Sequence, residues 1–255
     1  MIATLKMSIN PKNNKCLNYN VASLLHGVIM EMLDPAYCNF LHKSSLKPFT
    51  QYIIKAKDSN KYIWTINTLN LQAYEKIIKP MEKDSFNFFK INYKDIDVII
   101  EEKQVNSMHY KDLINKFYIE ETPSSIVKIR FITPTAFKSM GEYCFIPSFK
   151  LLYKSIMNKY DTFSNSFTIS SDEVLETLVE KTKIVDYALR SARFHLEGTK
   201  IPSFIGEITL KINGPETMIS LVSMLFEYSK WCGIGIKTAL GMGAVDVYLT
   251  NKMYK

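Results

Sequence analysis

The sequence has few of the features that mark secreted, metal-binding or membrane-spanning proteins. Its four cysteines are irregularly spaced, at positions 16, 38, 144 and 232. No Cys-x-x-Cys pair or Cys/His cluster suggests zinc, and we expect neither a metal nor another cofactor. The first residues contain no apolar signal-peptide core, and no apolar run reaches the 18 residues of a membrane span. We therefore expect a soluble, cytoplasmic protein with reduced thiols and no membrane partner.

Acidic residues are in the minority. Lysine and arginine number 32 against 25 aspartates and glutamates, which gives a net charge of +7. This excess suits a polyanionic partner without proving one. At 47% hydrophobic residues, the 255-residue chain can bury a core, which excludes global disorder and allows one large domain or two of ordinary size. Most of the fifteen tyrosines and fifteen phenylalanines are expected in that core.

Glycine is also scarce, yet four of the nine glycines fall within eleven residues near the C-terminus. These four are Gly233, Gly235, Gly241 and Gly243. Lys237 lies between the two Gly-x-Gly pairs, and residues 244–249 follow as a strand-like run. Glycine permits positive φ, so free N–H groups could line an anion-binding concavity to which Lys237 adds charge. We expect a phosphate backbone as the ligand.

Two familiar nucleotide-binding patterns do not fit this stretch. A P-loop needs Gly-Lys-Ser/Thr before a helix, and a Rossmann Gly-x-Gly-x-x-Gly also opens a helix, whereas this stretch feeds a strand. A glycine-rich turn without a ligand would explain one Gly-x-Gly pair. The full pattern, Gly-x-Gly-x-Lys-x-x-x-Gly-x-Gly before a terminal strand, is more specific.

Hydrophobic periodicity predicts a βαββαβ order in each half of the chain. In the first half the expected strands are residues 2–8, 48–57, 61–67, 86–91 and 96–103, with a turn at 58–60. The expected helices are residues 21–33, capped by Asn20, 36–42 and 69–78. Residues 115–125 look like a boundary. In the second half the strands are residues 126–132, 184–196, 203–212 and 244–249, and the helices are 149–160 and one that Gly214-Pro215 opens. We expect an α+β fold of two tandem ferredoxin-like domains, residues 1–120 and 121–255.

The glycine-rich stretch resembles the C-terminal loop of the RAMP superfamily of CRISPR-associated proteins. Within it, the chain looks like the repeat-specific endoribonucleases that cut CRISPR precursor RNA (Cas family six). Further similar segments are residues 131–137, 146–149, 40–42 and 47–50. The resemblance covers nearly the whole chain, in order. It implies a metal-independent enzyme with CRISPR repeat RNA as its partner, and subunits of an effector complex as further candidate partners, in a monomer or homodimer.

The resemblance also implies catalytic residues. His42 falls where the family has its general acid/base histidine, and Lys47 where it has a lysine. The family's tyrosine on the first helix corresponds to Met30, which cannot carry a proton. His26, four residues earlier and on the same side of the helix, is a candidate replacement, and its alternative is a structural histidine. Tyr37 is a weaker substitute.

These residues suit RNA cleavage by the ribose 2′-hydroxyl, which leaves a 2′,3′-cyclic phosphate and a 5′-hydroxyl. For RNA binding, the glycine-rich stretch is joined by Arg190 and Arg193. These two should face opposite sides of a strand, so at most one is expected to meet RNA and the other is an ordinary surface charge. The main alternative is a non-catalytic RNA-binding RAMP subunit of an effector complex. A ferredoxin-like interaction scaffold is a third reading, which leaves the glycine-rich stretch unexplained.

Overall fold

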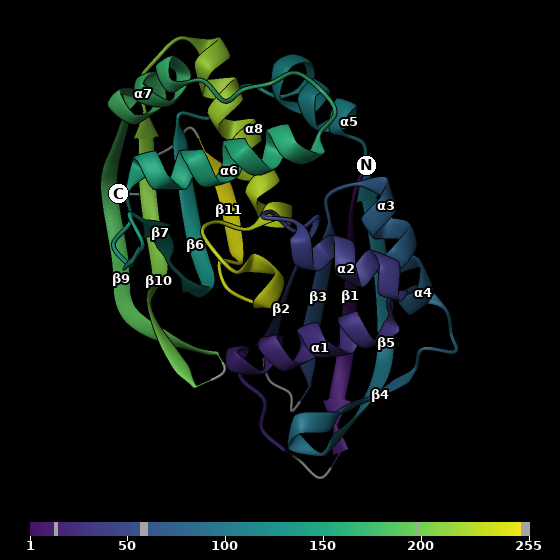
Figure 1. Cartoon of the computed structure of the whole chain (residues 1–255). Helices are drawn as coiled ribbons and strands as arrows, with labels where there is room; N and C mark the ends of the chain where they lie inside the picture. Colours follow the sequence, from purple (N-terminus) through teal and green to yellow (C-terminus); the bar gives the residue numbers. More distant parts are fainter. Residues whose placement is uncertain (13–14, 57–60, 197, 251–255) are drawn as a thin grey trace. The chain divides into compact units, whose positions relative to one another are not determined.

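The computed structural model describes residues 1–12, 15–56, 61–196 and 198–250 (Figure 1). It divides into two compact units. The first is Met1–Ser107 together with Lys237–Gly241, and the second is Met108–Ile236 together with the chain from Met242 onward. Five residues of the glycine-rich stretch thus belong to the first unit. No helix in the part of the chain that the structure describes is long and apolar enough to cross a membrane.

The first unit is built on a five-stranded sheet in the order β2-β3-β1-β5-β4. The strands are β1 (Ile2–Pro11), β2 (Phe49–Lys55), β3 (Tyr62–Thr68), β4 (Phe88–Ile91) and β5 (Ile96–Met108). Strand β3 is antiparallel to both β1 and β2, so these two run parallel and require the helical crossover that joins them. The predicted turn at residues 58–60 lies outside the described residues.

Side chains cap two of the helices of the first unit, those that begin at Pro35 and at Leu71. The helices of this unit are α1 (Ala22–Met32), α2 (Pro35–Lys43), α3 (Leu71–Ala73) and α4 (Lys79–Glu82), with a π-helical turn, Tyr74–Ile78, between the last two. Asp34 Oδ1 accepts a hydrogen bond from the backbone N–H of Tyr37 at 2.9 Å, and Pro35 occupies the favoured first position of α2. Asn18 caps the 3-10 turn Tyr19–Val21 that leads into α1, where it accepts from Asn20 N at 3.0 Å, and α1 itself has no side-chain cap, so the prediction of Asn20 as its cap was wrong.

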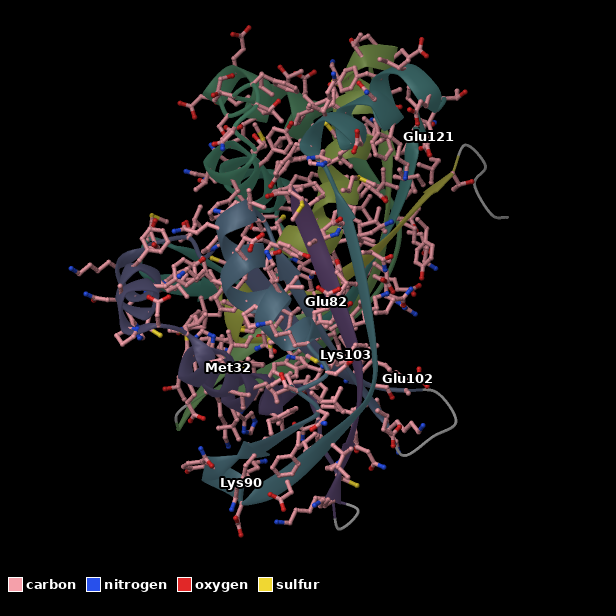
Figure 2. All side chains as sticks on the ribbon, turned by 90° about the vertical axis from the view of Figure 1, so that its right-hand side faces the viewer. Met32, Glu82, Lys90, Glu102, Lys103 and Glu121 are labelled. Carbon is pink, nitrogen blue, oxygen red and sulfur yellow. The ribbon has the colours of Figure 1, made fainter. Side chains whose placement is uncertain are left out.

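The β4 edge of this sheet is short and charged. Strand β4 has four residues, and Lys90 forms a 2.6 Å ion pair with Asp95. Figure 2 shows Lys90 on β4 and Lys103 farther along β5. Lys103 Nζ donates to the carbonyl of Lys83 at 2.6 Å. Short, charged edges of this kind oppose strand addition by another chain.

The second unit repeats the βαββαβ order. Its sheet order is β11-β6-β10-β9. The strands are β6 (Ile126–Thr135), β9 (Thr182–Leu196), β10 (Thr199–Ile212) and β11 (Val245–Thr250), and the crossover helices are α6 (Phe149–Phe163) and α8 (Glu216–Cys232). Tyr153 of α6 packs on Phe226 of α8 with ring centroids 5.6 Å apart. The predicted α+β fold of tandem ferredoxin-like units is confirmed.

Several elements were not predicted. They are α5 (Tyr110–Asn115), a π-helical turn Lys116–Glu120, the small hairpin β7 (Phe137–Ser139) with β8 (Glu142–Cys144), and α7 (Asp172–Lys181). The supposed boundary at residues 115–125 is therefore partly helical, because Phe117 is buried there. A local signal existed for α7, since Ser171 accepts a hydrogen bond from Val174 N and Asp172 follows it at the first helical position.

Packing inside the first unit requires a glycine at position 241. Its φ is +105°, and a Cβ built on it would lie 2.2 Å from the Cβ of Ala22 on α1. Both the backbone conformation and the space therefore exclude a larger residue. The adjoining Ala239 is 5% exposed and belongs to the hydrophobic core of this unit.

We expect Gly241→Ala to lower the free energy of unfolding by about 2 kcal/mol or more, the sum of left-handed strain and overpacking. Chemical denaturation would measure this. Gly141→Ala is the matched control, because Gly141 has φ +86° but no atom within 4 Å of the added Cβ. Adding Ala22→Gly to Gly241→Ala should restore part of the loss. Equal destabilisation by the two glycine variants would contradict the packing argument.

Candidate functional site

His26 lies on α1, and its ring is held by a backbone carbonyl from residues 237–241. The His26 Nδ1 atom is 3.2 Å from the carbonyl oxygen of Ala239. Because a carbonyl only accepts, this bond assigns the proton of the neutral imidazole to Nδ1 and leaves a lone pair on Nε2. The ring also stacks on Phe49, with centroids 5.7 Å apart and planes 7° apart. The imidazole is thereby fixed in orientation and in tautomer.

The same carbonyl accepts a second hydrogen bond, from a buried glutamine. Gln51 Nε2 donates to Ala239 O at 3.1 Å and to Ala22 O at 2.6 Å. Gln51 Oε1 in turn accepts from Trp64 Nε1 at 3.0 Å. Gln51 is 1% exposed, so these bonds satisfy its amide inside the protein. Sequence reasoning missed Gln51; the signal was a polar residue at an inward-facing position of the predicted strand 48–57.

The last turn of α2 carries His42, whose side chain is exposed. Lys47 folds back on that turn, and its Nζ donates to the carbonyl oxygens of Leu41 and of Ser44, the latter at 2.6 Å. Positive charge is favourable at the C-terminal end of a helix. Burial lowers the pKa of the Lys47 ammonium. Lys47 thus stabilises the helix end from which His42 projects.

His26, His42 and Lys47 lie close enough to act on one another electrostatically. Burial is the largest cause that lowers the pKa of His26; the bond to Ala239 raises it, and His42 and Lys47 lower it again. The neutral form of His26 is therefore favoured near neutral pH. The side chains of His42, on α2, and Lys47, in the loop before β2, thus both influence the charge of His26 on α1, and the role of the three in catalysis stays a prediction.

The other candidates for the proton partner fit less well. Met30 is packed against the hydrophobic core. The hydroxyl of Tyr37 is buried and has no hydrogen-bond partner among the residues described. Burial raises the pKa of Tyr37 to about 12. A phenol held in its neutral form so strongly is a poor proton carrier, so the geometry favours His26 over Tyr37.

The backbone of the glycine-rich stretch is less open than the sequence suggested. Six backbone N–H groups of the stretch and its exit donate hydrogen bonds to acceptors within the second unit. They belong to Gly233, Ile234, Gly235, Ile236, Gly243 and Ala244. The Cβ position of Gly235 faces Ala136 O at 2.3 Å rather than open space. The expectation that free N–H groups line a concavity here was therefore wrong for most of the stretch. RNA contact by Gly233, Gly235, Gly241 and Gly243 stays a prediction.

The basic residues chosen for RNA binding are exposed. Lys237 is a left-handed residue with φ 55°, and its side chain is exposed at the start of residues 237–241. Arg190 and Arg193 are exposed on β9, the edge strand of the second sheet. They pair with Ile205 and Pro202 in regular register, which puts them on opposite faces as expected.

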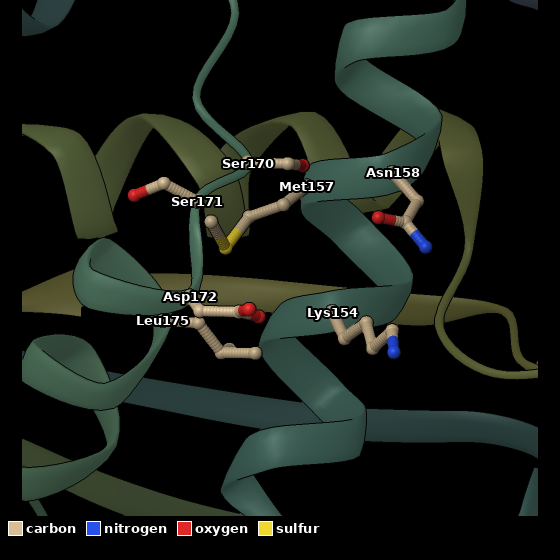
Figure 3. A pocket seen from close by; sticks show the side chains of 7 residues that line it. All are labelled: Lys154, Met157, Asn158, Ser170, Ser171, Asp172 and Leu175. Carbon is tan, nitrogen blue, oxygen red and sulfur yellow. The ribbon is translucent and has the colours of Figure 1, made fainter.

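A surface pocket of about 240 Å³ lies between α6 and the start of α7 (Figure 3). Lys154 and Asp172 are its charged lining residues. It contains no histidine or cysteine and no pairing of a nucleophile with a base. Across the described ranges, no group of three or more His, Cys, Asp or Glu side chains could hold a metal ion.

Comparison with known proteins shows what this chain is similar to. Residues 129–245 match the family model described as CRISPR-associated endoribonuclease Cas6. A protein of that name from Streptococcus thermophilus is 29% identical over 229 residues, which cover 89% of this chain and 91% of the relative. The chain is thus similar to Cas6 endoribonucleases, through residues 129–245 in the family model and over most of its length in this relative. A relative of the same name from Mycobacterium tuberculosis is 26% identical, over 96% of this chain and 77% of its own length.

Solved Cas6 structures share the fold over almost the whole chain. A Cas6 product complex superimposes with a TM-score of 0.80 at 19% identity, over 97% of this chain and 100% of that one. Thermus thermophilus Cas6 gives a TM-score of 0.74 at 18% identity, over 97% and 98%. A Cas6 substrate mimic complex gives 0.75 at 17% identity, over 97% and 99%. At these identities the likeness establishes the Cas6 fold.

We expect NMR of the intact protein to show the neutral His26 imidazole as the Nδ1–H tautomer, with a pKa below the reference value of about 6.5. The bond to Ala239 assigns the tautomer, and burial causes the shift. Histidine nitrogen chemical shifts followed over pH measure both. An Nε2–H tautomer, or a titration at or above the reference value, would contradict the geometry.

The free energy of unfolding should depend on the protonation of His26. A histidine with a lowered pKa binds fewer protons in the folded state, so the free energy of unfolding should fall as pH drops below about 6.5. His26→Gln should lose that part of the pH dependence, which denaturation at a series of pH values would measure. An unchanged slope in His26→Gln would assign the effect to other groups.

Proposed function

We propose that this chain is a metal-independent endoribonuclease that cuts CRISPR precursor RNA within the repeat and so generates mature crRNA. The observation that carries the proposal is the grouping of His26, His42 and Lys47 in a chain similar to Cas6 endoribonucleases. Both curated relatives reported above are named CRISPR-associated endoribonuclease Cas6. Two histidines and an ammonium can together move two protons and stabilise one developing charge.

The geometry suggests a different proton-transfer role for each of the two histidines. His26 is held neutral with Nδ1–H bonded to Ala239, so Nε2 can accept the proton of the ribose 2′-hydroxyl. The 2′-oxygen then attacks the adjacent phosphorus, and the bond from phosphorus to the 5′-oxygen breaks. His42, as an imidazolium, gives its proton to that leaving oxygen. The products are a 2′,3′-cyclic phosphate and a 5′-hydroxyl.

Lys47 has two parts in this scheme. Its ammonium adds positive charge where negative charge builds on the phosphoryl oxygens. Its hydrogen bonds to Leu41 O and Ser44 O also hold the end of α2, and His42 with it. Loss of Lys47 would therefore affect both transition-state charge and the placement of the acid.

Repeat RNA is the proposed partner. Exposed Lys237 and one of Arg190 and Arg193, which lie on opposite faces of β9, supply charge for its phosphates, and attraction of this kind is sequence-independent and salt-sensitive. The glycine-rich stretch is proposed to meet the same strand. Subunits of a CRISPR effector complex are a second proposed partner class, and the reaction is placed in the cytoplasm. A non-catalytic RNA-binding subunit would share the fold, so cleavage itself separates the two functions.

His42→Ala should lower the single-turnover cleavage rate by about 10²–10⁴-fold and leave the RNA dissociation constant nearly unchanged. The reason is that His42 moves a proton while charge and the glycine-rich stretch bind the RNA. Lys43→Ala is the matched control, since it removes the exposed neighbour on the same helical turn. Wild-type cleavage by His42→Ala would remove His42 from the mechanism.

Replacing the ribose upstream of the scissile phosphate by 2′-deoxyribose should abolish cleavage at that bond, because the nucleophile is gone. Binding should barely change, and a deoxy substitution one nucleotide away should leave cleavage intact. Both RNAs are tested in EDTA, where the unmodified repeat should still be cut to a cyclic phosphate. Normal cutting of the deoxy bond, or activity that requires added magnesium or manganese, would reject the mechanism.

A further inference from the structure

A lysine is buried in the second unit beneath the start of the glycine-rich stretch. Lys159 lies on α6 and is 5% exposed. Its Nζ atom donates to three backbone carbonyl oxygens, those of Cys232 at 3.1 Å, Gly233 at 2.9 Å and Gly235 at 3.2 Å. No acidic side chain is paired with it in the described part of the unit. A buried charge without a carboxylate needs a specific reason.

The three carbonyls supply that reason. An ammonium has three N–H donors, and here each finds one backbone acceptor. Cys232 is the last residue of α8, where carbonyl groups lack an intrahelical donor and a positive charge is favoured. Burial lowers the pKa of Lys159, and its electrostatic interaction with Cys232 opposes that effect. Three carbonyl acceptors around one nitrogen also favour the charged form. The ammonium group of Lys159 thus holds together the backbone carbonyls of the turn that leads from α8 into the glycine-rich stretch.

A second side chain of α6 holds the same turn. Ser155 lies one helical turn before Lys159, and its Oγ accepts a hydrogen bond from Gly235 N at 2.9 Å. Helix α6 therefore binds Gly235 through both its N–H and its C=O. Gly235 has φ +87° and no room for a Cβ, because Ala136 O would lie 2.3 Å away. Its conformation is imposed by the protein before any ligand arrives.

We infer that Lys159 and Ser155 are positioning residues that preform the glycine-rich stretch for RNA. This inference rests on the proposed function, in which that stretch meets repeat RNA. A preformed segment loses little conformational freedom on binding, so its supporting residues affect affinity without touching the ligand. Lys159 is inside the protein and belongs to a different helix from His26 and His42, so its loss changes binding while the proton-transfer residues stay intact.

Lys159→Met keeps most of the side-chain volume and removes the donors. It should raise the dissociation constant for host repeat RNA by about 10- to 100-fold, the range expected for losing charge-assisted hydrogen bonds. The single-turnover rate on saturating RNA should stay within about threefold of wild type. Lys154→Met, an exposed lysine on the same helix, is the matched control and should bind like wild type.

Ser155 provides the test should Lys159→Met fold poorly. Ser155→Ala should weaken RNA binding and speed hydrogen exchange of the Gly235 amide in the RNA-free protein, whereas Ser155→Thr, which keeps the hydroxyl, should retain both. Wild-type RNA affinity and wild-type protection of the Gly235 amide in both Ser155→Ala and Lys159→Met would overturn this inference and leave the proposed function unaffected. Wild-type protein that fails to bind repeat RNA would overturn the proposed function and this inference with it.

Discussion

The carbonyl oxygen of Ala239 is the atom on which the candidate site depends. It accepts from His26 Nδ1 and from Gln51 Nε2, and so joins α1 and β2 through a segment more than 180 residues later in the chain. An acceptor with two donors fixes both of them at once. The tautomer of His26 therefore depends on residues 237–241 packing into the core of the first unit, which in turn depends on Gly241 having no side chain.

The glycine-rich stretch is better understood as a closed hydrogen-bonded turn than as an open ring of donors. Lys159 Nζ donates to carbonyl oxygens at its start, and Ser155 Oγ accepts a hydrogen bond from the N–H of Gly235. Glycine is needed there for left-handed conformation and for close approach to the protein's own backbone. Glycine in this stretch is therefore explained by packing within the protein, without a bound phosphate.

Local signals predicted much of the fold. The alternating and helical patterns located the strands and the crossover helices of both units, because each such element buries one face. The π-helical turn Lys116–Glu120 and the hairpin β7–β8 were not predicted, since their burial comes from partners distant in sequence. The prediction of Asn20 as a helix cap was wrong because Asn18, two residues earlier, has the extended backbone of a cap and its side chain accepts the N–H of Asn20.

The sequence by itself supplied the candidate residues: His42, Lys47 and a glycine-rich stretch in the order typical of one family, with His26 as a candidate replacement for that family's tyrosine. It could not determine their environment. Gln51 and Lys159 carry no motif, and each matters because it binds a carbonyl oxygen far along the chain, that of Ala239 for Gln51, 188 positions away, and that of Cys232 for Lys159, 73 positions away. Hydrogen-bond direction, burial and the resulting shift in the pKa of His26 arise only when those groups are brought together, because electrostatic and hydrogen-bonding energies depend on distance in space.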